Sequence, residues 1–262
     1  MMHGTRHMPP PGYERLASAG INAVGLSSLA APLREALSEG SFYEYAAHHP
    51  EARVLNGRGA AYAVPLPGTD VRAVVRRSRH GGLLAPLTGE RFMGGTRAPR
   101  ELASSLRLTR LGVATPQLLA YATYPDMPHL RRADVVTREI PEAVDLAAAL
   151  MAAEYRSAVR PLLGAVARLI ASLTIAGARH PDLNIKNVLI AHNENGDREA
   201  LVIDVDRVWF DEPGARRVTE RNLRRLSRSA LKWHRLHALP IVEADLLWLA
   251  ATVEEILMSR RS

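Results

Sequence analysis

Three polar residues stand at the ends of two short apolar runs in the second half of the chain. Asp182 and Asn187 precede the run "VLIA", and Asp204 ends the run "ALVI". The turn "HNENGD" between the runs predicts a β-hairpin, which brings the start of its first strand next to the end of its second. We therefore expect Asn187 and Asp204 to lie side by side, with Asp182 on the loop that leads into the hairpin.

Clustered carboxylates repel one another, so their grouping needs a cation or another stabilising partner. Mg²⁺ prefers oxygen ligands and is held by one or two carboxylates together with amides, waters and substrate phosphates. Asn187 and Asp204 are therefore candidate metal ligands, and Asp182 is free to accept the proton of a hydroxyl, as phosphoryl transfer requires. Each residue taken singly is also typical of a cap or a turn. Asp206 stays open between a salt bridge and a supporting metal role.

The elements around these residues predict an α+β protein with two unlike parts. Short strand patterns separated by turns, and one helix at 97–112, fill the first part; the strands are expected at 52–56, 60–66, 71–77, 116–125 and 133–140. From residue 143 the pattern is helical, apart from the hairpin. We expect a partly ordered N-terminal extension at 1–40, a strand-rich part at 41–140 and a helix-rich part at 141–262.

The strand-rich part offers candidate phosphate-binding groups. The loop "NGRG" between two expected strands contains Gly57, Arg58 and Gly59; backbone N–H groups of glycines can approach phosphate oxygens, although the same residues suit an ordinary hairpin. No lysine precedes Lys186, so a phosphate-binding cation on the strand 71–77 must be an arginine.

The expected cation on that strand is Arg76, with Arg77 on the opposite face because side chains alternate along a strand. Glu101 is the only acidic residue of the helix at 97–112 and is the expected partner of the cation. A solvated glutamate favoured by the helix dipole is the alternative interpretation of Glu101.

The 262 residues carry a formal net charge of +7 and contain no cysteine, which excludes disulfides and thiolate metal sites. No stretch has the uncharged apolar length of a membrane span. The basic balance favours an anionic partner. Arg221, Arg224, Arg225 and Arg228 share roughly one side of a helix, which is either a solvated face or a landing surface for anionic lipid. Only 5% of residues are aromatic, so stacking platforms for nucleic acid are few.

The segments "HPDLNIKNVLI" and "LVIDVDR" resemble the catalytic and metal loops of the protein-kinase-like fold. Motifs spread between residues 55 and 233 resemble the lipopolysaccharide core kinases, in particular those that phosphorylate 3-deoxy-D-manno-octulosonic acid (Kdo). The resemblance implies a bilobal kinase-like fold that transfers the γ-phosphoryl group of ATP, with Mg²⁺, to a Kdo hydroxyl of the lipid A-linked inner core. It also implies a cytoplasmic protein at the inner membrane of a Gram-negative bacterium.

The same resemblance implies roles for individual residues. Asp182 is the base, Asn187 and Asp204 bind Mg²⁺, Arg76 with Glu101 contacts the phosphates, and the backbone of Glu139 and Ile140 meets adenine. Further arginines are expected to contact the acceptor: Arg79, Arg91 and Arg97.

Two features depart from the pattern of the wider fold. Pro181 replaces a small residue before Asp182, and only a short stretch separates Asp204 from the following helix, which argues against a protein substrate. The alternatives are a kinase-like phosphotransferase for another small molecule or glycan, or a catalytically weak nucleotide-binding pseudokinase. A net charge of +7 argues against a cationic acceptor such as an aminoglycoside.

Overall fold

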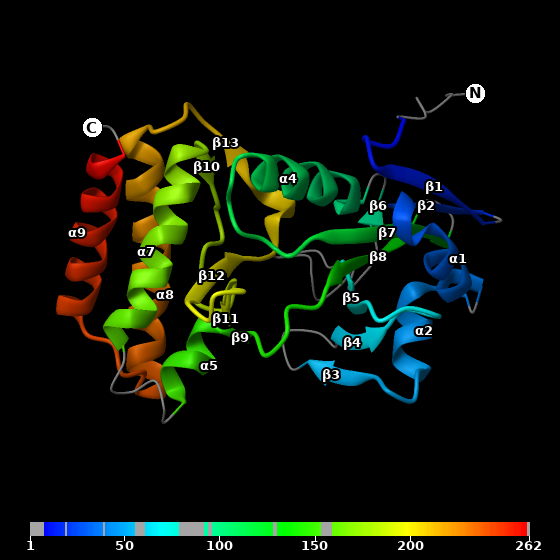
Figure 1. The fold of residues 1–262 in the computed structure, drawn as a ribbon, viewed down its shortest axis with the longest axis horizontal. Coiled ribbons are helices and arrows are strands. Elements are labelled where there is room, and N and C mark those ends of the chain that lie inside the picture. Colours follow the sequence, from blue (N-terminus) through cyan, green and yellow to red (C-terminus); the bar gives the residue numbers. More distant parts are fainter. Residues whose placement is uncertain are drawn as a thin grey trace. The chain divides into compact units, whose positions relative to one another are not determined.

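The computed structural model describes residues 8–18, 20–38, 40–55, 61–78, 92–93, 96–127, 130–152 and 159–260. Its internal contacts divide the chain into two units (Figure 1). Unit 1 comprises Met1–Leu102 and Gln117–Glu139, and unit 2 comprises Ala103–Pro116 and Ile140–Ser262. Unit 1 is rich in strands and unit 2 is rich in helices, so the predicted α+β class is confirmed.

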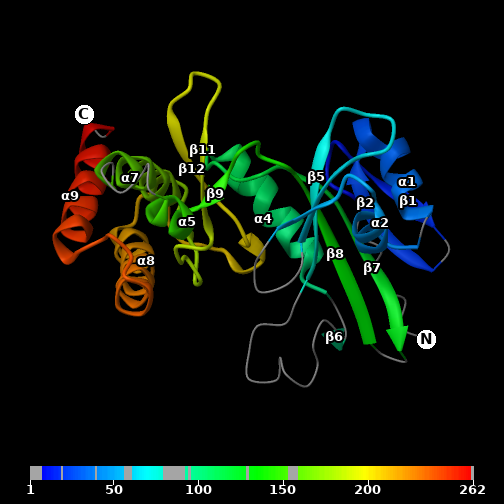
Figure 2. The ribbon, with the colours of Figure 1, turned by 90° about the horizontal axis from the view of Figure 1, so that it is seen from below.

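Unit 1 is built on an eight-stranded antiparallel sheet. Its order is β1 (Tyr13–Ser18), β2 (Ile21–Leu26), β7 (Leu118–Met127), β8 (Leu130–Arg138), β5 (Arg72–Arg77), β4 (Ala61–Pro65) and β3 (Arg53–Leu55), and β6 (Phe92–Met93) also pairs with β8. The long strands β7 and β8 run side by side in Figure 2. In β5, Ala73 and Val75 are buried, whereas Arg72, Val74 and Arg76 are partly exposed. This alternation is typical of a strand with one face on the core.

Residues 13–38 are more structured than a partly ordered extension. They form β1, β2, a 3₁₀ turn η1 (Ser27–Leu29) and helix α1 (Ala30–Ser38), and β2 pairs with β7. A Cβ on Gly25 would lie 2.7 Å from a methyl group of Leu33, so glycine lets α1 approach β2 closely. These strands were not predicted, because their apolar positions alternate poorly and because β2, with which β1 pairs, is itself paired with a strand about 100 residues away.

Unit 2 is a helical core with small sheets at one end. Its helices are α5 (Leu146–Met151), α7 (Val159–Ile175), α8 (Arg216–His237) and α9 (Glu243–Ser259). Its strands are β9 (Val144–Asp145), β11 (Val188–His192) and β12 (Arg198–Val202) in one sheet, and β10 (Ala178–Arg179) and β13 (Trp209–Phe210) in another. Helix α7 is apolar on most sides and contacts both α8 and α9, so it forms the centre of this core.

Helix α4 (Ala98–Arg110) begins in unit 1 and ends in unit 2. It stops where the sequence predicts, because Gly112 adopts a φ of +73° and the N–H of Val113 donates to the carbonyl of Leu108.

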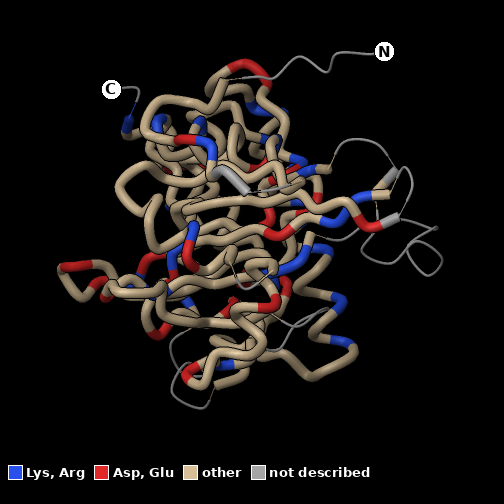
Figure 3. Tube along the Cα trace, turned by 90° about the vertical axis from the view of Figure 1, so that its right-hand side faces the viewer, with Lys and Arg blue, Asp and Glu red and all other residues tan. Residues whose placement is uncertain are grey.

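Charge is distributed unevenly among these elements. Basic and acidic positions are both scattered over the trace in Figure 3. Helix α8 differs, because it carries eight arginines or lysines and one glutamate; its net charge of +7 equals that of the whole chain. No helix in the described ranges is long and apolar enough to cross a membrane.

Candidate active site

The segment that carries Asp182 begins at a tight turn after α7. Gly177 has a φ of +67°, and a Cβ there would lie 2.3 Å from the carbonyl oxygen of Asp211, so only glycine fits. Strand β10 follows and pairs with β13, and the loop 180–187 then leads into β11. The loop is therefore held by a strand at each end.

His180 joins this loop to the end of β12. The backbone N–H of Asp182 donates to Nδ1 of His180 at 3.2 Å, so Nδ1 is unprotonated and Nε2 donates to the carbonyl of Ile203 at 3.1 Å. Burial lowers the pKa of His180, which is 2% exposed, and this favours the neutral ring that both contacts require. A neutral histidine thus links the residue before Asp204 to the backbone of Asp182.

Two amide side chains shape the turn after Asp182. The Nδ2 atoms of Asn184 and Asn187 both donate to the carbonyl oxygen of Asp182, at 3.0 and 2.9 Å. Because the Asn187 nitrogen is committed to this bond, its Oδ1 is the atom left to bind a ligand. An amide oxygen is a ligand that Mg²⁺ accepts.

The hairpin brings the ends of β11 and β12 together. Val188 lies opposite Val202, and the N–H of Ile203 donates to the carbonyl of Asn187 at 3.1 Å. Asp204 follows directly, in the left-handed region with φ of 62° and ψ of 48°, a conformation that aspartate tolerates better than most residues. Asn187 and Asp204 therefore stand at the same end of one hairpin.

Among the residues that the structure describes, no three His, Asp or Glu side chains are grouped so that they could hold a metal ion by themselves. One carboxylate and one amide oxygen, from Asp204 and Asn187, fit Mg²⁺, which keeps several waters and takes substrate phosphates as its other ligands. They would suit Zn²⁺ poorly, because it prefers nitrogen and sulfur ligands in closed tetrahedral sites.

Helix α8 supports the Asp182 loop from one face. Asn222 is fully buried; its Oδ1 accepts the N–H of His180 and its Nδ2 donates to the carbonyl of Ala178, both at 3.0 Å. Arg225 lies about one turn after Asn222 and contacts Asp182. Ser229 lies one turn further along and accepts the N–H of Ile185. Asn222 was not predicted from the sequence, although a polar residue on the apolar side of this helix was a usable signal.

The contacts of Arg225 correct its assignment to the basic outer side of α8. Its Nη2 forms an ion pair with Oδ1 of Asp182, and its Nε donates to the carbonyl of Pro181 at 3.1 Å. Arg224 is exposed, whereas Arg225 lies one residue on, about 100° round the helix and next to the buried face. Sequence spacing alone did not separate the two, because the packed side of α8 was not known.

In unit 1, Arg76 on β5 forms an ion pair with Oε1 of Glu101 on α4. The Glu101 side chain is 4% exposed and that of Arg76 is 29% exposed. Arg77 points elsewhere, since its guanidinium lies 3.9 Å from the centre of the Tyr43 ring. Arg76 is therefore the arginine that pairs with the helix glutamate, and its contact with phosphates stays a prediction.

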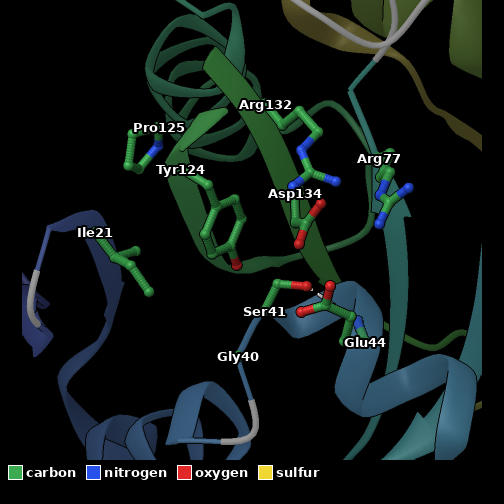
Figure 4. Close-up of a pocket in the computed structure, with 9 residues that line it drawn as sticks. All are labelled: Ile21, Gly40, Ser41, Glu44, Arg77, Tyr124, Pro125, Arg132 and Asp134. Carbon is green, nitrogen blue, oxygen red and sulfur yellow. Dashed lines mark hydrogen bonds between the residues drawn. The ribbon is translucent and has the colours of Figure 1, made fainter. Parts of the chain in front are cut away.

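Arg77 instead borders a polar hollow of about 250 Å³ together with Asp134 (Figure 4). Three side chains here accept the first N–H groups of α2 (Phe42–His48): Tyr124, Asp134 and Ser41, at 3.0, 3.0 and 3.1 Å. These bonds satisfy donors that a helix start leaves unpaired. The hollow therefore has a structural role in docking α2. Burial raises the pKa of Asp134 in it to about 6.

The segment expected to contact adenine is partly committed to bonds within the fold. The N–H of Glu139 donates to the carbonyl of Arg72 at 3.0 Å, and the Glu139 carboxylate pairs with both Arg72 and Arg53. The carbonyl of Ile140 accepts the N–H of Ala143 at 3.3 Å. Within the part of the chain that the structure describes, the carbonyl of Glu139 and the N–H of Ile140 are the groups left for the predicted contact.

The remaining predicted residues fall into two groups. Arg221 and Arg224 are exposed on α8, and Arg97 is half-buried just before α4. The others lie outside the described residues: Gly57, Arg58, Gly59, Arg79 and Arg91.

The chain is similar in sequence to known lipopolysaccharide kinases. Residues 52–252 match the model of the lipopolysaccharide kinase (Kdo/WaaP) family. A 3-deoxy-D-manno-octulosonic acid kinase of Vibrio parahaemolyticus is 30% identical over 182 residues, which is 68% of this chain and 71% of that protein. One from Xanthomonas oryzae pv. oryzae is 34% identical over 180 residues, covering 67% of this chain and 68% of that protein.

A solved structure described as WaaP in complex with acyl carrier protein has a similar fold. It matches with a TM-score of 0.54 and 22% identity, and the match covers 87% of this chain and 90% of that one. The match to the family model spans most of the chain and two thirds of it aligns with kinases at 30% identity or above. The chain therefore belongs to the lipopolysaccharide kinase (Kdo/WaaP) family and is a kinase.

Proposed function

We propose that this kinase transfers the γ-phosphoryl group of ATP to a hydroxyl of Kdo in the lipid A-linked inner core of lipopolysaccharide, in a reaction that requires Mg²⁺. Membership of the family supports the phosphotransfer, and the names of the relatives support Kdo as the acceptor. The residues of unit 2 support the chemistry.

The observation that carries the proposal is the set of bonds joining Asp182, Asn187 and the residue before Asp204. The Asn187 side chain donates to the carbonyl of Asp182, and the Asn187 carbonyl accepts the N–H of Ile203. These bonds join Asp182, Asn187 and Ile203, the residue before Asp204, and this arrangement supports the proposed roles of a proton acceptor and two oxygen ligands. In this proposal, Asp182 orients the acceptor hydroxyl and accepts its proton during transfer.

The Oδ1 of Asn187 and the carboxylate of Asp204 hold the metal in this proposal. When bound, Mg²⁺ would supply positive charge to offset the charge that develops on the phosphates. The left-handed backbone at Asp204 directs its carboxylate from a fixed 3₁₀ turn, η2 (Val205–Arg207), rather than from a long flexible loop.

Unit 1 contributes a cation for the phosphates. Glu101 holds the guanidinium of Arg76 from α4, so the arginine is oriented before nucleotide arrives. A planar guanidinium has several donors in fixed directions and can bind a carboxylate and a phosphate at the same time. A lysine ammonium would instead act on both as a point charge. Phosphate contacts from Gly57, Arg58 and Gly59, and adenine contacts from Glu139 and Ile140, are part of the same proposal.

The acceptor is anionic and attached to a lipid, which suits a basic surface. Arg221 and Arg224 are exposed on α8, whose charge equals the excess of the whole chain. We propose that they contact phosphorylated lipid or the anionic inner-membrane surface, where each basic residue contributes about 1 kcal/mol. Arg79, Arg91 and Arg97 are proposed acceptor contacts, and nucleic acid is not an expected partner.

The test is incubation of the protein with γ-labelled ATP and Mg²⁺ in the presence of Kdo-bearing lipid A precursors, an aminoglycoside or casein. Label should appear on the Kdo species alone, and should be lost with a chelator or in Asp182→Asn. Label on the aminoglycoside would make this a different small-molecule kinase. Nucleotide binding without transfer to any acceptor would indicate a pseudokinase.

A further inference from the structure

We propose that Arg225 is a positioning residue for Asp182, orienting its carboxylate from α8 so that Oδ2 receives the proton of the acceptor hydroxyl. This inference rests on the proposed function, because it assumes that Asp182 is the base. It assigns a role to a residue that sequence spacing grouped with the solvent-facing arginines of the helix.

The guanidinium of Arg225 contacts two neighbouring groups of the loop at once. Its Nη2 pairs with Oδ1 of Asp182, and its Nε donates to the carbonyl of Pro181 at 3.1 Å. A planar fork with fixed donor directions can fix both the backbone and the carboxylate, whereas an ammonium group on a flexible stem cannot. The pair therefore defines a direction for the Asp182 side chain as well as a charge next to it.

Arg225 differs from the other α8 residues that hold this loop. Asn222 contacts the backbone of His180 and Ala178, and Ser229 contacts the backbone N–H of Ile185. Of these three residues, only Arg225 reaches the side chain of Asp182. Because Asn222 and Ser229 retain the backbone without it, loss of the arginine should disturb the carboxylate more than the loop.

The ion pair occupies one carboxylate oxygen of Asp182 and leaves the other to accept a proton. With Oδ1 on the guanidinium, Oδ2 is the oxygen that can accept a proton from a hydroxyl. The Asp182 and Arg225 side chains are 32% and 36% exposed, so an acceptor can reach the pair from solvent. A base misplaced by about 1 Å costs roughly 100-fold in rate, which sets the scale of the expected effect.

The experiment compares Arg225→Gln and Arg225→Lys with the matched control Arg216→Gln. Arg216 lies on the same helix, is 85% exposed and pairs only weakly with Glu220 of the next turn, so its variant loses the same charge without touching the loop. We expect kcat to fall about 10- to 100-fold in Arg225→Gln, with the KM of ATP and of the acceptor changed less than about 2-fold. Arg225→Lys should recover part of the loss, and the control should match the wild type.

A double-mutant cycle with Asp182→Asn separates positioning from general structural support. If Arg225 acts through Asp182, adding Arg225→Gln to Asp182→Asn should change the residual kcat by less than about 3-fold. Independent, multiplying losses would overturn the proposal. So would a raised acceptor KM with kcat intact, because that result would make Arg225 an acceptor-binding residue.

The wild-type protein is assayed first on the Kdo acceptor. If it transfers no phosphate there, the proposed acceptor is wrong, and the same cycle is run on slow ATP hydrolysis, in which water replaces the hydroxyl. Coupling between Arg225 and Asp182 in hydrolysis would sustain the positioning role without Kdo. Its absence would contradict the positioning role, whatever the acceptor is.

Discussion

Two arginine–carboxylate pairs, one in each unit, connect a helix to the segment that carries a predicted functional residue. In unit 1 the carboxylate of Glu101 is almost fully buried and Arg76 covers it. In unit 2 both members of the Asp182–Arg225 pair are about one third exposed. A buried carboxylate that loses a cation stays desolvated, whereas an exposed one is solvated by water. The first pair should therefore support the fold, and the second should matter mainly for chemistry.

The largest effect should come from Asp182→Asn, which removes the base from the exposed pair. We expect kcat to fall by about 10³-fold, within the range that general bases contribute. Nucleotide affinity and the unfolding midpoint should change little, because the amide keeps the size of the side chain and the pair is partly solvated. Kinetics, nucleotide titration and thermal unfolding measure the three quantities. Retained turnover would remove Asp182 from the role of base.

Arg76→Ala should break the buried pair and destabilise the protein. It removes the Arg76 guanidinium from the buried Glu101 carboxylate, and removal of one member of a buried pair costs up to about 3–5 kcal/mol. Nucleotide affinity should fall as well. Arg76→Lys and the double variant Arg76→Ala/Glu101→Gln are the controls, since each avoids an uncompensated buried charge. Chemical denaturation gives the free energy of unfolding. Equal stability of Arg76→Ala and wild type would show that the pair is not part of the fold.

Asp134 extends the comparison to a buried carboxylate held mainly by hydrogen bonds. Burial raises its pKa to about 6 in the folded protein, above its ordinary value of 3.8. The folded state then binds more protons than the unfolded state between about pH 4 and pH 6, so stability falls as pH rises through this window. The shift corresponds to a loss on the order of 2–3 kcal/mol.

Asp134→Asn should remove this slope. The amide oxygen can still accept the N–H of Tyr43, but the side chain no longer ionises. The measurement is the free energy of unfolding from pH 3.5 to 7, and the difference between variant and wild type isolates the carboxyl from the other titrating groups. A constant difference across the window would contradict the raised pKa.

The smallest effect is expected on membrane binding, from the exposed side of α8 rather than from the side that contacts Asp182. Arg221→Glu/Arg224→Glu should weaken binding to vesicles containing anionic lipid, by about 1 kcal/mol or more per residue. Binding to neutral vesicles and turnover of a soluble acceptor should be unchanged. Sedimentation with vesicles of both compositions measures this. Undiminished binding to the anionic vesicles would leave this side of α8 a solvated surface.

Local patterns predicted much of the fold. Strands β3, β4, β5, β7 and β8 and helix α4 lie where alternation, turns and helical spacing indicated. Strands β1 and β2 were missed because their apolar positions alternate poorly and because the hairpin that they form is joined to the sheet through a distant strand, β7. The small strands β9, β10 and β13 were missed for a different reason, since two residues carry no periodic signal.

The sequence by itself determined the grouping of Asp182, Asn187 and Asp204, because a short hairpin and the loop before it are local structures whose geometry follows from spacing. It also indicated Glu101 as the partner of a strand arginine. Only the tertiary structure decided that Arg76, rather than Arg77, pairs with Glu101 and that Arg225, rather than Arg224, reaches Asp182. The side chains of neighbouring residues on a strand or helix point in different directions. Which of them reaches a given partner is decided only when one face of the element is packed against the rest of the fold.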